Sequence, residues 1–181
     1  LKRQVNSGLY ERLALSRDKR GIRKLAQHGQ IVGRPQDLLK EPYVLEFLGL
    51  DEKAAYSETD LESAIINKLE HFLLELGKGF LFEARQKRFT FDADHFFVDL
   101  VFYNRLLRCY VLIDLKLGEL THADVGQMDG YVRMFDDLCL CEGDNPTIGL
   151  ILCTEKNETV AKYSVLKDRR QIFASKYTLY L

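Results

Sequence analysis

Residues 96–116 read FFVDLVFYNRLLRCYVLIDLK, two apolar runs on either side of a short polar segment. The runs 96–103 and 109–116 are rich in aromatic and β-branched residues, and the residues between them have the composition of a turn, so the stretch predicts a β-hairpin. Each run carries one carboxylate between apolar neighbours, Asp99 in the first and Asp114 in the second. If the hairpin turns symmetrically about its centre, these two acids lie directly opposite each other.

The two acids and a nearby lysine predict a cluster of charged side chains on one face of this sheet. Asp114 and Lys116 are two residues apart, so they point to the same face of one strand. Buried carboxylates that face each other repel unless a proton or a cation lies between them. Hard oxygen ligands of this kind suit Mg²⁺, which takes one or two carboxylates and keeps several waters. Two bland interpretations stay open, a buried Asp–Lys ion pair without catalysis and an aspartate at a strand edge.

An amphipathic helix precedes the hairpin and supplies a third acid. Apolar residues follow a 3.6-residue period over 59–76, with Thr59 as the predicted N-cap and Glu62 three residues later, the pattern of a capping box. Glu62 can either complete that box or face the sheet. After the glycines that end this helix, residues 80–91 predict an extended segment.

The chain beyond the hairpin continues with alternating helices and strands. The predicted elements are a helix over 121–138, a strand over 147–153, a helix over 156–167 and a strand over 171–181. The order of helix, three strands, helix and strand predicts an α/β core of the form αβββαβ, with a central mixed sheet flanked by helices.

The N-terminal part of the chain differs from the rest in charge. We predict a basic helical appendage or linker over 1–50 and the main domain over 51–181, with a helix over 2–27 and short helical turns over 36–50. Residues 1–40 contain ten Lys and Arg against three acids, although the whole chain is nearly neutral at −1. Such a segment is either a solvated helix face or a contact for nucleic-acid phosphates.

Composition excludes several classes of protein. The chain has 181 residues, of which 46% are hydrophobic and 29% charged, values typical of a globular domain and unlike those of a disordered chain. The sequence contains no stretch of about 18 uncharged apolar residues, so it predicts no membrane-spanning helix. The four cysteines form no C-x-x-C pair, which favours a reducing, cytoplasmic compartment. The chain begins at Leu1, which suggests that it is part of a longer protein.

The acids, the lysine and one glutamine together resemble the PD-(D/E)XK nuclease superfamily. The shared pattern is an acid opening a helix, an acid in the second strand, D-x-K in the third strand and a glutamine, Gln127, in the next helix. The sequence is most similar to the YhcG-type nuclease domain within that superfamily. The stretches that carry this resemblance are TDLE (59–62), FLLELGKG (72–79), FFVDLVFY (96–103), LIDLKLG (112–118), GQM (126–128) and NPTIGLILC (145–153).

The resemblance implies a restriction-endonuclease-like fold and a Mg²⁺-dependent nuclease that hydrolyses DNA phosphodiester bonds, with Mn²⁺ as a substitute metal. The metal-binding acids of the family correspond to Asp99 and Asp114. Glu62 is the helix-borne acid, which acts on the metal directly or through water. The carbonyl oxygen of Leu115 is a further expected ligand.

The resemblance also assigns the remaining catalytic residues. Lys116 is the lysine of the D-x-K motif and serves the attacking water, and Gln127 orients Lys116 or that water. Two positions depart from the usual pattern, because Asp114 stands where close relatives commonly have Glu, and Val98 precedes Asp99 where Pro is common. A shorter acid shifts the carboxylate oxygens, but neither departure predicts an inactive site.

The expected partners follow from the same resemblance. They are DNA, an N-terminal domain of the full-length protein and a second copy of the chain, because cutting both strands with one site per chain favours a dimer. One alternative is a nucleic-acid-binding or interaction module on a nuclease-like fold, with weak or lost cleavage. A purely structural partner domain of a larger complex is the third possibility.

Overall fold

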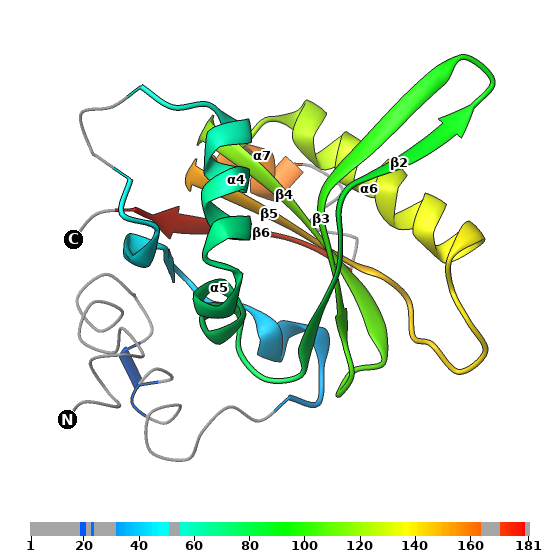
Figure 1. Ribbon diagram of the computed structural model, residues 1–181, viewed down its shortest axis with the longest axis horizontal. Helices are drawn as coiled ribbons and strands as arrows, with labels where there is room; N and C mark the ends of the chain where they lie inside the picture. Colours follow the sequence, from blue (N-terminus) through cyan, green and yellow to red (C-terminus); the bar gives the residue numbers. More distant parts are fainter. Residues whose placement is uncertain (1–18, 21–22, 24–31, 51–54, 164–170, 180–181) are drawn as a thin grey trace.

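Six strands form one mixed sheet at the centre of the computed structural model, which describes residues 19–20, 23, 32–50, 55–163 and 171–179 (Figure 1). The order across the sheet is β1-β6-β5-β4-β3-β2. The strands are β1 (Tyr43–Val44), β2 (Phe80–Phe91), β3 (Asp94–Asn104), β4 (Cys109–Glu119), β5 (Ile148–Glu155) and β6 (Ile172–Thr178). Strands β2, β3 and β4 pair antiparallel, and β4, β5, β6 and β1 pair parallel.

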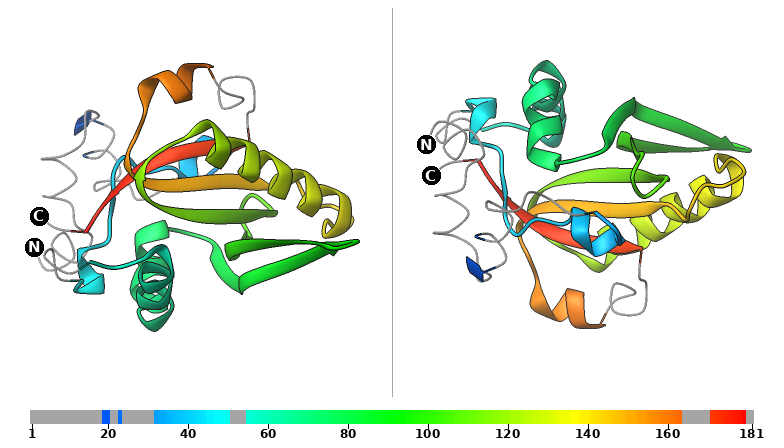
Figure 2. Two further views of the ribbon diagram at one scale, coloured as in Figure 1. Left: turned by 90° about the horizontal axis from the view of Figure 1, so that it is seen from above. Right: turned by 90° about the horizontal axis from the view of Figure 1, so that it is seen from below.

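Helices cover both faces of this sheet. They are η1 (Pro35–Leu38), η2 (Glu46–Leu48), α4 (Glu58–Asn67), α5 (Leu69–Leu76), α6 (His122–Leu138) and α7 (Glu158–Tyr163), η marking a 3₁₀ helix. Figure 2 shows α4 on one side of the sheet and α6 with α7 on the other. Two separate clusters of buried side chains correspond to the two faces, one around Phe72 and Phe102, the other around Val132 and Ile151. The expected αβββαβ order and the mixed sheet between helical layers are confirmed.

The N-cap of α4 lies two residues before the expected one. Ser57, not Thr59, caps α4: its hydroxyl accepts the Asp60 N–H at 3.2 Å, and the Asp60 carboxylate accepts the Ser57 N–H at 2.8 Å. The S-x-x-D pattern satisfies the same capping rule as T-x-x-E. The capping role considered for Glu62 is therefore wrong. The expected single helix is also divided, because Lys68 leaves the helical conformation between α4 and α5.

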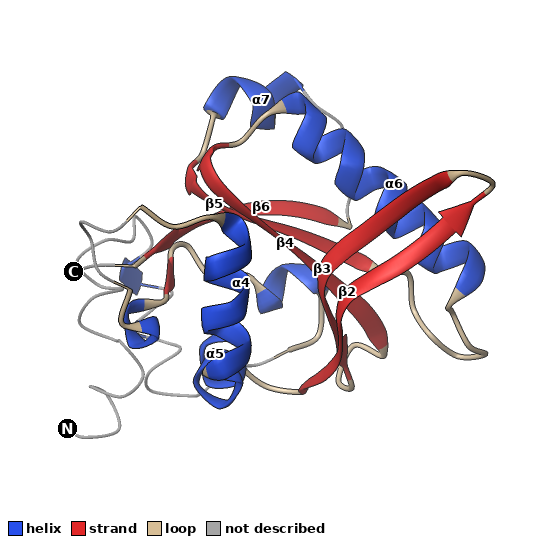
Figure 3. Cartoon of the chain, turned by 45° about the horizontal axis from the view of Figure 1, so that its top comes forward, coloured by secondary structure: helices blue, strands red, loops and turns tan. Residues whose placement is uncertain are grey.

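The β3–β4 hairpin has the predicted symmetric register. Leu100 pairs with Ile113 and the pairing continues to the turn without a shift. On the side away from the turn, the pairing ends at Leu100 and Ile113, although β3 starts at Asp94 and β4 runs on to Glu119. The two strands therefore diverge, and Figures 1 and 3 show the β2–β3 hairpin leaving the plane of the sheet beside α6. We call the point of divergence the fork.

Part of the expected appendage packs in the core of the sheet. β1 pairs parallel with β6, and Leu38, Tyr43, Leu45 and Leu48 are buried in the same cluster as the residues of α4. The division of the chain at residue 50 stays a prediction, and this packing favours an earlier boundary. The helix expected over 2–27 lies almost wholly outside the described residues.

Within the described residues, no helix is both long enough and apolar enough to cross a membrane.

Candidate active site

The fork brings the two strand acids together. The last pair of the β3–β4 register is Leu100 with Ile113, and Asp99 and Asp114 are the next residue on each strand on the side away from the turn. Asp99 Oδ2 accepts the N–H of Leu115 at 3.1 Å, so its carboxylate reaches across to β4. Asp114 is buried, with 3% of its surface exposed. The predicted facing pair of carboxylates is thus present where the strands separate.

The environment of Asp114 disfavours its charged form. Burial, and then the neighbouring charge of Asp99, raise the pKa of Asp114 to about 7, although Lys116 acts in the opposite direction. Asp114 Oδ2 lies 3.1 Å from Lys116 Nζ, and apart from that ion pair this buried oxygen has no hydrogen-bond partner among the described residues. A buried carboxylate beside another carboxylate favours a proton or a further cation next to its oxygens.

Lys116 is surrounded by three carboxylates. In addition to Asp114, its Nζ lies 3.8 Å from Glu58 Oε2 and 3.9 Å from Asp124 Oδ1. Burial opposes the charged amine, but these carboxylates, Asp114 foremost, raise its pKa above the ordinary value. The Tyr177 hydroxyl also donates to the Lys116 carbonyl at 3.1 Å. Lys116 is therefore held as a cation beside the two acids.

Glu62 faces the sheet from α4. It is buried, with 3% of its surface exposed, and its carboxylate accepts from Arg85 Nε and from Gln86 Nε2. Gln86 Nε2 also donates to Asp99 Oδ1 at 3.1 Å. The helix-borne acid is thus linked to Asp99 through the amide of Gln86 on β2.

The two strand acids fit a divalent cation better than the expected three acids do. Among the described residues no three His, Cys, Asp and Glu side chains are arranged to hold a metal, so Glu62 does not join Asp99 and Asp114 in such a group. Mg²⁺ needs only one or two protein carboxylates, and Asp114 Oδ2, which has the Lys116 ion pair but no hydrogen bond among the described residues, is a suitable donor. A role for the Leu115 carbonyl stays a prediction.

Gln127 lies on α6 and contacts a tyrosine, not the lysine. Its Nε2 donates to the Tyr131 hydroxyl at 2.7 Å. Tyr131 is buried, and its pKa is raised first by burial and then by the charge of Asp114, so the phenol lies within electrostatic reach of that acid. Within the described contacts, any action of Gln127 on the acidic site passes through this phenol.

The comparison with known families identifies the domain. The sequence pattern of the YhcG PDDEXK nuclease domain matches residues 36–181. The chain belongs to this family. Membership, together with the mixed sheet and its helical layers, confirms the restriction-endonuclease-like class and the resemblance seen in the sequence.

A relative of known name shares this domain. The protein "Putative nuclease YhcG" of Escherichia coli (strain K12) is 41% identical over 183 residues, covering 100% of this chain and 48% of the relative. The chain thus spans about half the length of that relative.

Solved structures show a more distant likeness. The "Structure of EndoMS-dsDNA2 complex" is 16% identical with a TM-score of 0.48, covering 70% of this chain and 48% of the other. The "crystal structure of a repair endonuclease from Pyrococcus abyssi" is 20% identical with a TM-score of 0.45, covering 72% and 49%.

The structure adds residues to this YhcG-type site that the sequence analysis missed. Glu58 and Asp124 stand in the first turns of α4 and α6, where acids are common for helix-capping reasons alone. The Thr121-x-x-Asp124 capping box was a visible signal of that position. No pattern in the sequence distinguished Gln86 or Tyr131.

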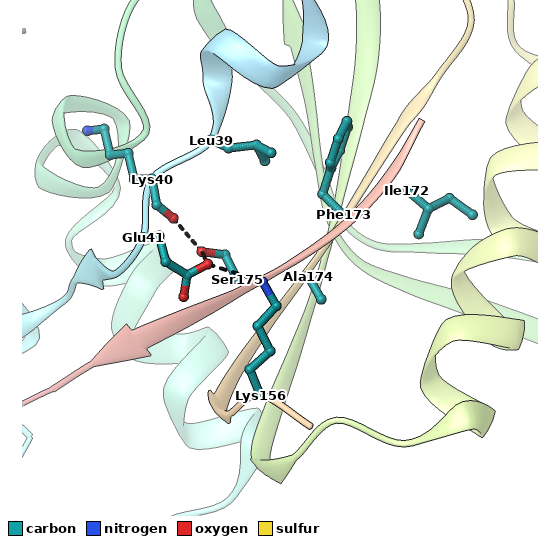
Figure 4. Close-up of a pocket in the computed structure, with 8 residues that line it drawn as sticks. All are labelled: Leu39, Lys40, Glu41, Lys156, Ile172, Phe173, Ala174 and Ser175. Carbon is teal, nitrogen blue, oxygen red and sulfur yellow. Dashed lines mark hydrogen bonds and ion pairs between the residues drawn. The ribbon is translucent and has the colours of Figure 1, made fainter. Parts of the chain in front are cut away.

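A hollow elsewhere on the sheet is lined by polar side chains that already have partners. It measures about 320 Å³ and lies along β6 (Figure 4). Three of the polar side chains around it are joined: Lys156 Nζ lies 3.4 Å from Glu41 Oε2, and Ser175 Oγ donates to Glu41 Oε2 at 3.2 Å. The fourth, Lys40, donates to the Glu75 carbonyl. Glu41 Oε1 in turn accepts the Lys176 N–H at 3.2 Å. These contacts join the segment before β1 to β6.

Proposed function

We propose that this YhcG-type domain is a Mg²⁺-dependent nuclease that hydrolyses DNA phosphodiester bonds, with Mn²⁺ as a substitute metal. The observation that carries the proposal is the meeting of Asp99, Asp114 and Lys116 at the fork of the sheet. Two carboxylates at one point form a donor set that suits a hard cation, and the buried Asp114 Oδ2 has no hydrogen bond among the described residues to compete with the metal.

The proposal assigns the metal to the two strand acids. Asp99 and Asp114 would hold Mg²⁺, with Glu62 acting from α4 and the Leu115 carbonyl as a further oxygen donor. A bound Mg²⁺ would act as a Lewis acid on the phosphate and lower the pKa of a bound water.

The other residues act by position and charge. Lys116 keeps its proton, because three carboxylates stabilise the ammonium, so it stabilises negative charge that develops on the phosphate and positions the attacking water. Tyr131 accepts a hydrogen bond from Gln127, and the charge of Asp114 acts on its phenol. Gln127 then orients the phenol, and through it the water or Lys116.

DNA as the substrate rests on the family resemblance and on charge. The basic residues of 1–40 offer phosphate contacts. The same charge favours one alternative, a nucleic-acid-binding module with weak or lost cleavage. In that case binding would survive Asp114→Ala and no DNA form would be cut.

The test is cleavage of linear, branched and single-stranded DNA with Mg²⁺ or Mn²⁺. We expect the wild type to cut at least one form and Lys116→Ala to cut none. Lys156→Ala is the matched control, because Lys156 pairs with Glu41 of the segment before β1 and not with the acids at the fork. No cleavage by the wild type above the Lys116→Ala level would reject the nuclease. Calorimetric titration of Mn²⁺ into wild type and Asp114→Ala tests the metal site separately.

We further infer a cytoplasmic location and a homodimer for cutting both strands. All four cysteines are free thiols, which supports a reducing compartment. The rest of the full-length protein would supply an N-terminal domain. Sedimentation of the chain with and without DNA measures its oligomeric state.

A further inference from the structure

Gln86 connects two acids that come from different elements. It stands on β2 between Arg85, which pairs with Leu100, and Lys87, which pairs with Val98, so it lies opposite Asp99 on β3. Its side-chain amide donates to Asp99 Oδ1 at 3.1 Å and to Glu62 Oε2 on α4. One nitrogen therefore links the helix-borne acid to a strand acid.

Gln86 makes these contacts from an unfavourable backbone conformation. Its φ is +48°, in the left-handed region that side chains other than Gly, Asn and Asp rarely adopt. A strand interior has no turn that requires this conformation. Strained residues of this kind persist where surrounding contacts hold them, and they cluster at functional sites.

The neighbouring contacts hold Glu62 in place for this link. Arg85 Nε binds Glu62 Oε1, and Arg85 Nη2 donates to Ser63 Oγ at 3.0 Å. Among the described residues each oxygen of Glu62 thus has one donor, and of these two donors the Gln86 amide also bonds to Asp99. Asp99 is likewise held at both oxygens, by Gln86 and by the Leu115 N–H.

We propose that Gln86 is a positioning residue that orients Asp99 for the metal and carries the effect of Glu62 to it. Glu62 then acts through the amide of Gln86 and is not itself a metal ligand. This inference rests on the proposed metal site, since it concerns the residues that orient one of its two acids. Such outer contacts commonly change metal affinity 10- to 100-fold.

The first test replaces Gln86 with glycine. Gly adopts a positive φ without strain, so Gln86→Gly is expected to keep the circular dichroism and the metal-free Tm of the wild type or to raise that Tm. The same variant is expected to bind Mn²⁺ at least ten times more weakly in calorimetry. Asp92→Gly is the matched control, because Asp92 has a φ of +50° at the tip of the β2–β3 hairpin. It is expected to leave Mn²⁺ affinity unchanged.

The second test asks whether Glu62 acts through Gln86. Glu62→Gln should weaken Mn²⁺ binding in the wild-type background and have no further effect in the Gln86→Gly background. An equal loss in both backgrounds would make Glu62 a direct ligand and overturn the proposal.

Two outcomes separate this inference from the proposed function. If the wild type binds Mn²⁺, Asp114→Ala abolishes binding and Gln86→Gly binds as the wild type does, the role of Gln86 is rejected while the metal site stands. If the wild type binds no Mn²⁺ either alone or with DNA, the metal site itself is rejected and the role of Gln86 with it.

Discussion

Asp114 is subject to two opposed requirements, because metal binding needs its negative charge and its buried position disfavours that charge. Its pKa is raised from 3.8 to about 7, so the folded state keeps a proton that the unfolded state releases. This contribution to stability is complete below about pH 4 and is lost as the pH rises towards 7. We expect metal-free Asp114→Asn to lose that pH dependence.

The magnitude of this effect is measurable by denaturation. At pH 8 we expect Asp114→Asn to unfold with a free energy roughly 1–3 kcal/mol above that of the metal-free wild type. Urea titrations at several pH values between 4 and 8, without divalent metal, give the two curves. Parallel curves for the two proteins would contradict the raised pKa. With Mn²⁺ present, only the wild type should gain stability.

Lys116 should affect the rate of cleavage more than metal binding. Lys116→Met removes the ammonium that stabilises developing charge, so we expect kcat to fall by about 10²–10³-fold. The Kd for Mn²⁺ should stay the same or decrease, because a positive charge 3.1 Å from Asp114 has been removed. Single-turnover cleavage and calorimetry measure the two quantities. A loss of Mn²⁺ binding in Lys116→Met would show that the lysine holds the acids in place.

Two glycines, one packed closely against its neighbours and one with open space beside it, test how α6 packs on the sheet. A Cβ at Gly149 on β5 would lie 2.6 Å from Met128 and 3.0 Å from Val132 of α6, whereas a Cβ at Gly130 would meet nothing within 4 Å. We expect Gly149→Ala to lower the free energy of unfolding by roughly 1–3 kcal/mol, because α6 must move off the sheet. Gly130→Ala should raise it by up to about 1 kcal/mol through helix propensity.

The same pair of variants links packing to the site. α6 carries Gln127, so a shift of the helix by Gly149→Ala should also lower the cleavage rate. Chemical denaturation and cleavage assays of both variants check this. Unchanged stability of Gly149→Ala would mean that Met128 gives way without cost. A lower cleavage rate for Gly130→Ala despite its higher stability would place DNA close to that glycine.

What the sequence predicts at this scale depends on whether the signal is local. The hairpin register follows from the symmetry of two apolar runs, so the facing of Asp99 and Asp114 was predictable. The start of α4 was not, because Ser57-x-x-Asp60 and Thr59-x-x-Glu62 satisfy the same capping rule before one apolar stripe. The φ of Gln86 left no signal in the sequence, since contacts with other elements impose it.

The pairing of β1 with β6 shows the same limit over a longer distance. Tyr43 pairs with Tyr177, and a strand of two residues has no periodicity to detect. A short segment around Pro42 therefore predicts helical turns, which η1 and η2 confirm, but not a strand between them. The pairing with β6 and the burial of Leu45 and Leu48 in the core, both tertiary features, show that this segment completes the sheet.

Across the whole molecule, the positive charge expected to bind DNA and the acids expected to cleave it lie in different parts of the sequence. The N-terminal forty residues are strongly basic, while the acids of the site repel phosphate. If the basic residues bind the DNA backbone, log K should fall linearly with log[salt], with a slope of about −0.9 for each phosphate contacted. The background for this measurement is Lys116→Ala, so that DNA is bound and not cut.

Removing five of those charges should then flatten the salt dependence. The substitutions are Arg17→Gln, Lys19→Gln, Arg20→Gln, Arg23→Gln and Lys24→Gln. We expect the slope to lose up to about 4 units and the affinity at low salt to fall steeply. The control neutralises five exposed basic residues of the sheet domain. They are Lys68, Lys78, Arg105, Arg133 and Lys176.

The two variants distinguish the routes by which DNA reaches the fork. A slope lowered only by the N-terminal substitutions means that this segment holds the DNA while Asp99 and Asp114 act on it. Asp114→Ala should then bind as well as Lys116→Ala or better, because one repelling carboxylate is gone. If both sets of substitutions lower the slope equally, the contact is spread over the domain. If neither does, the affinity for DNA does not come from these phosphate contacts and the basic segment is a solvated helix face.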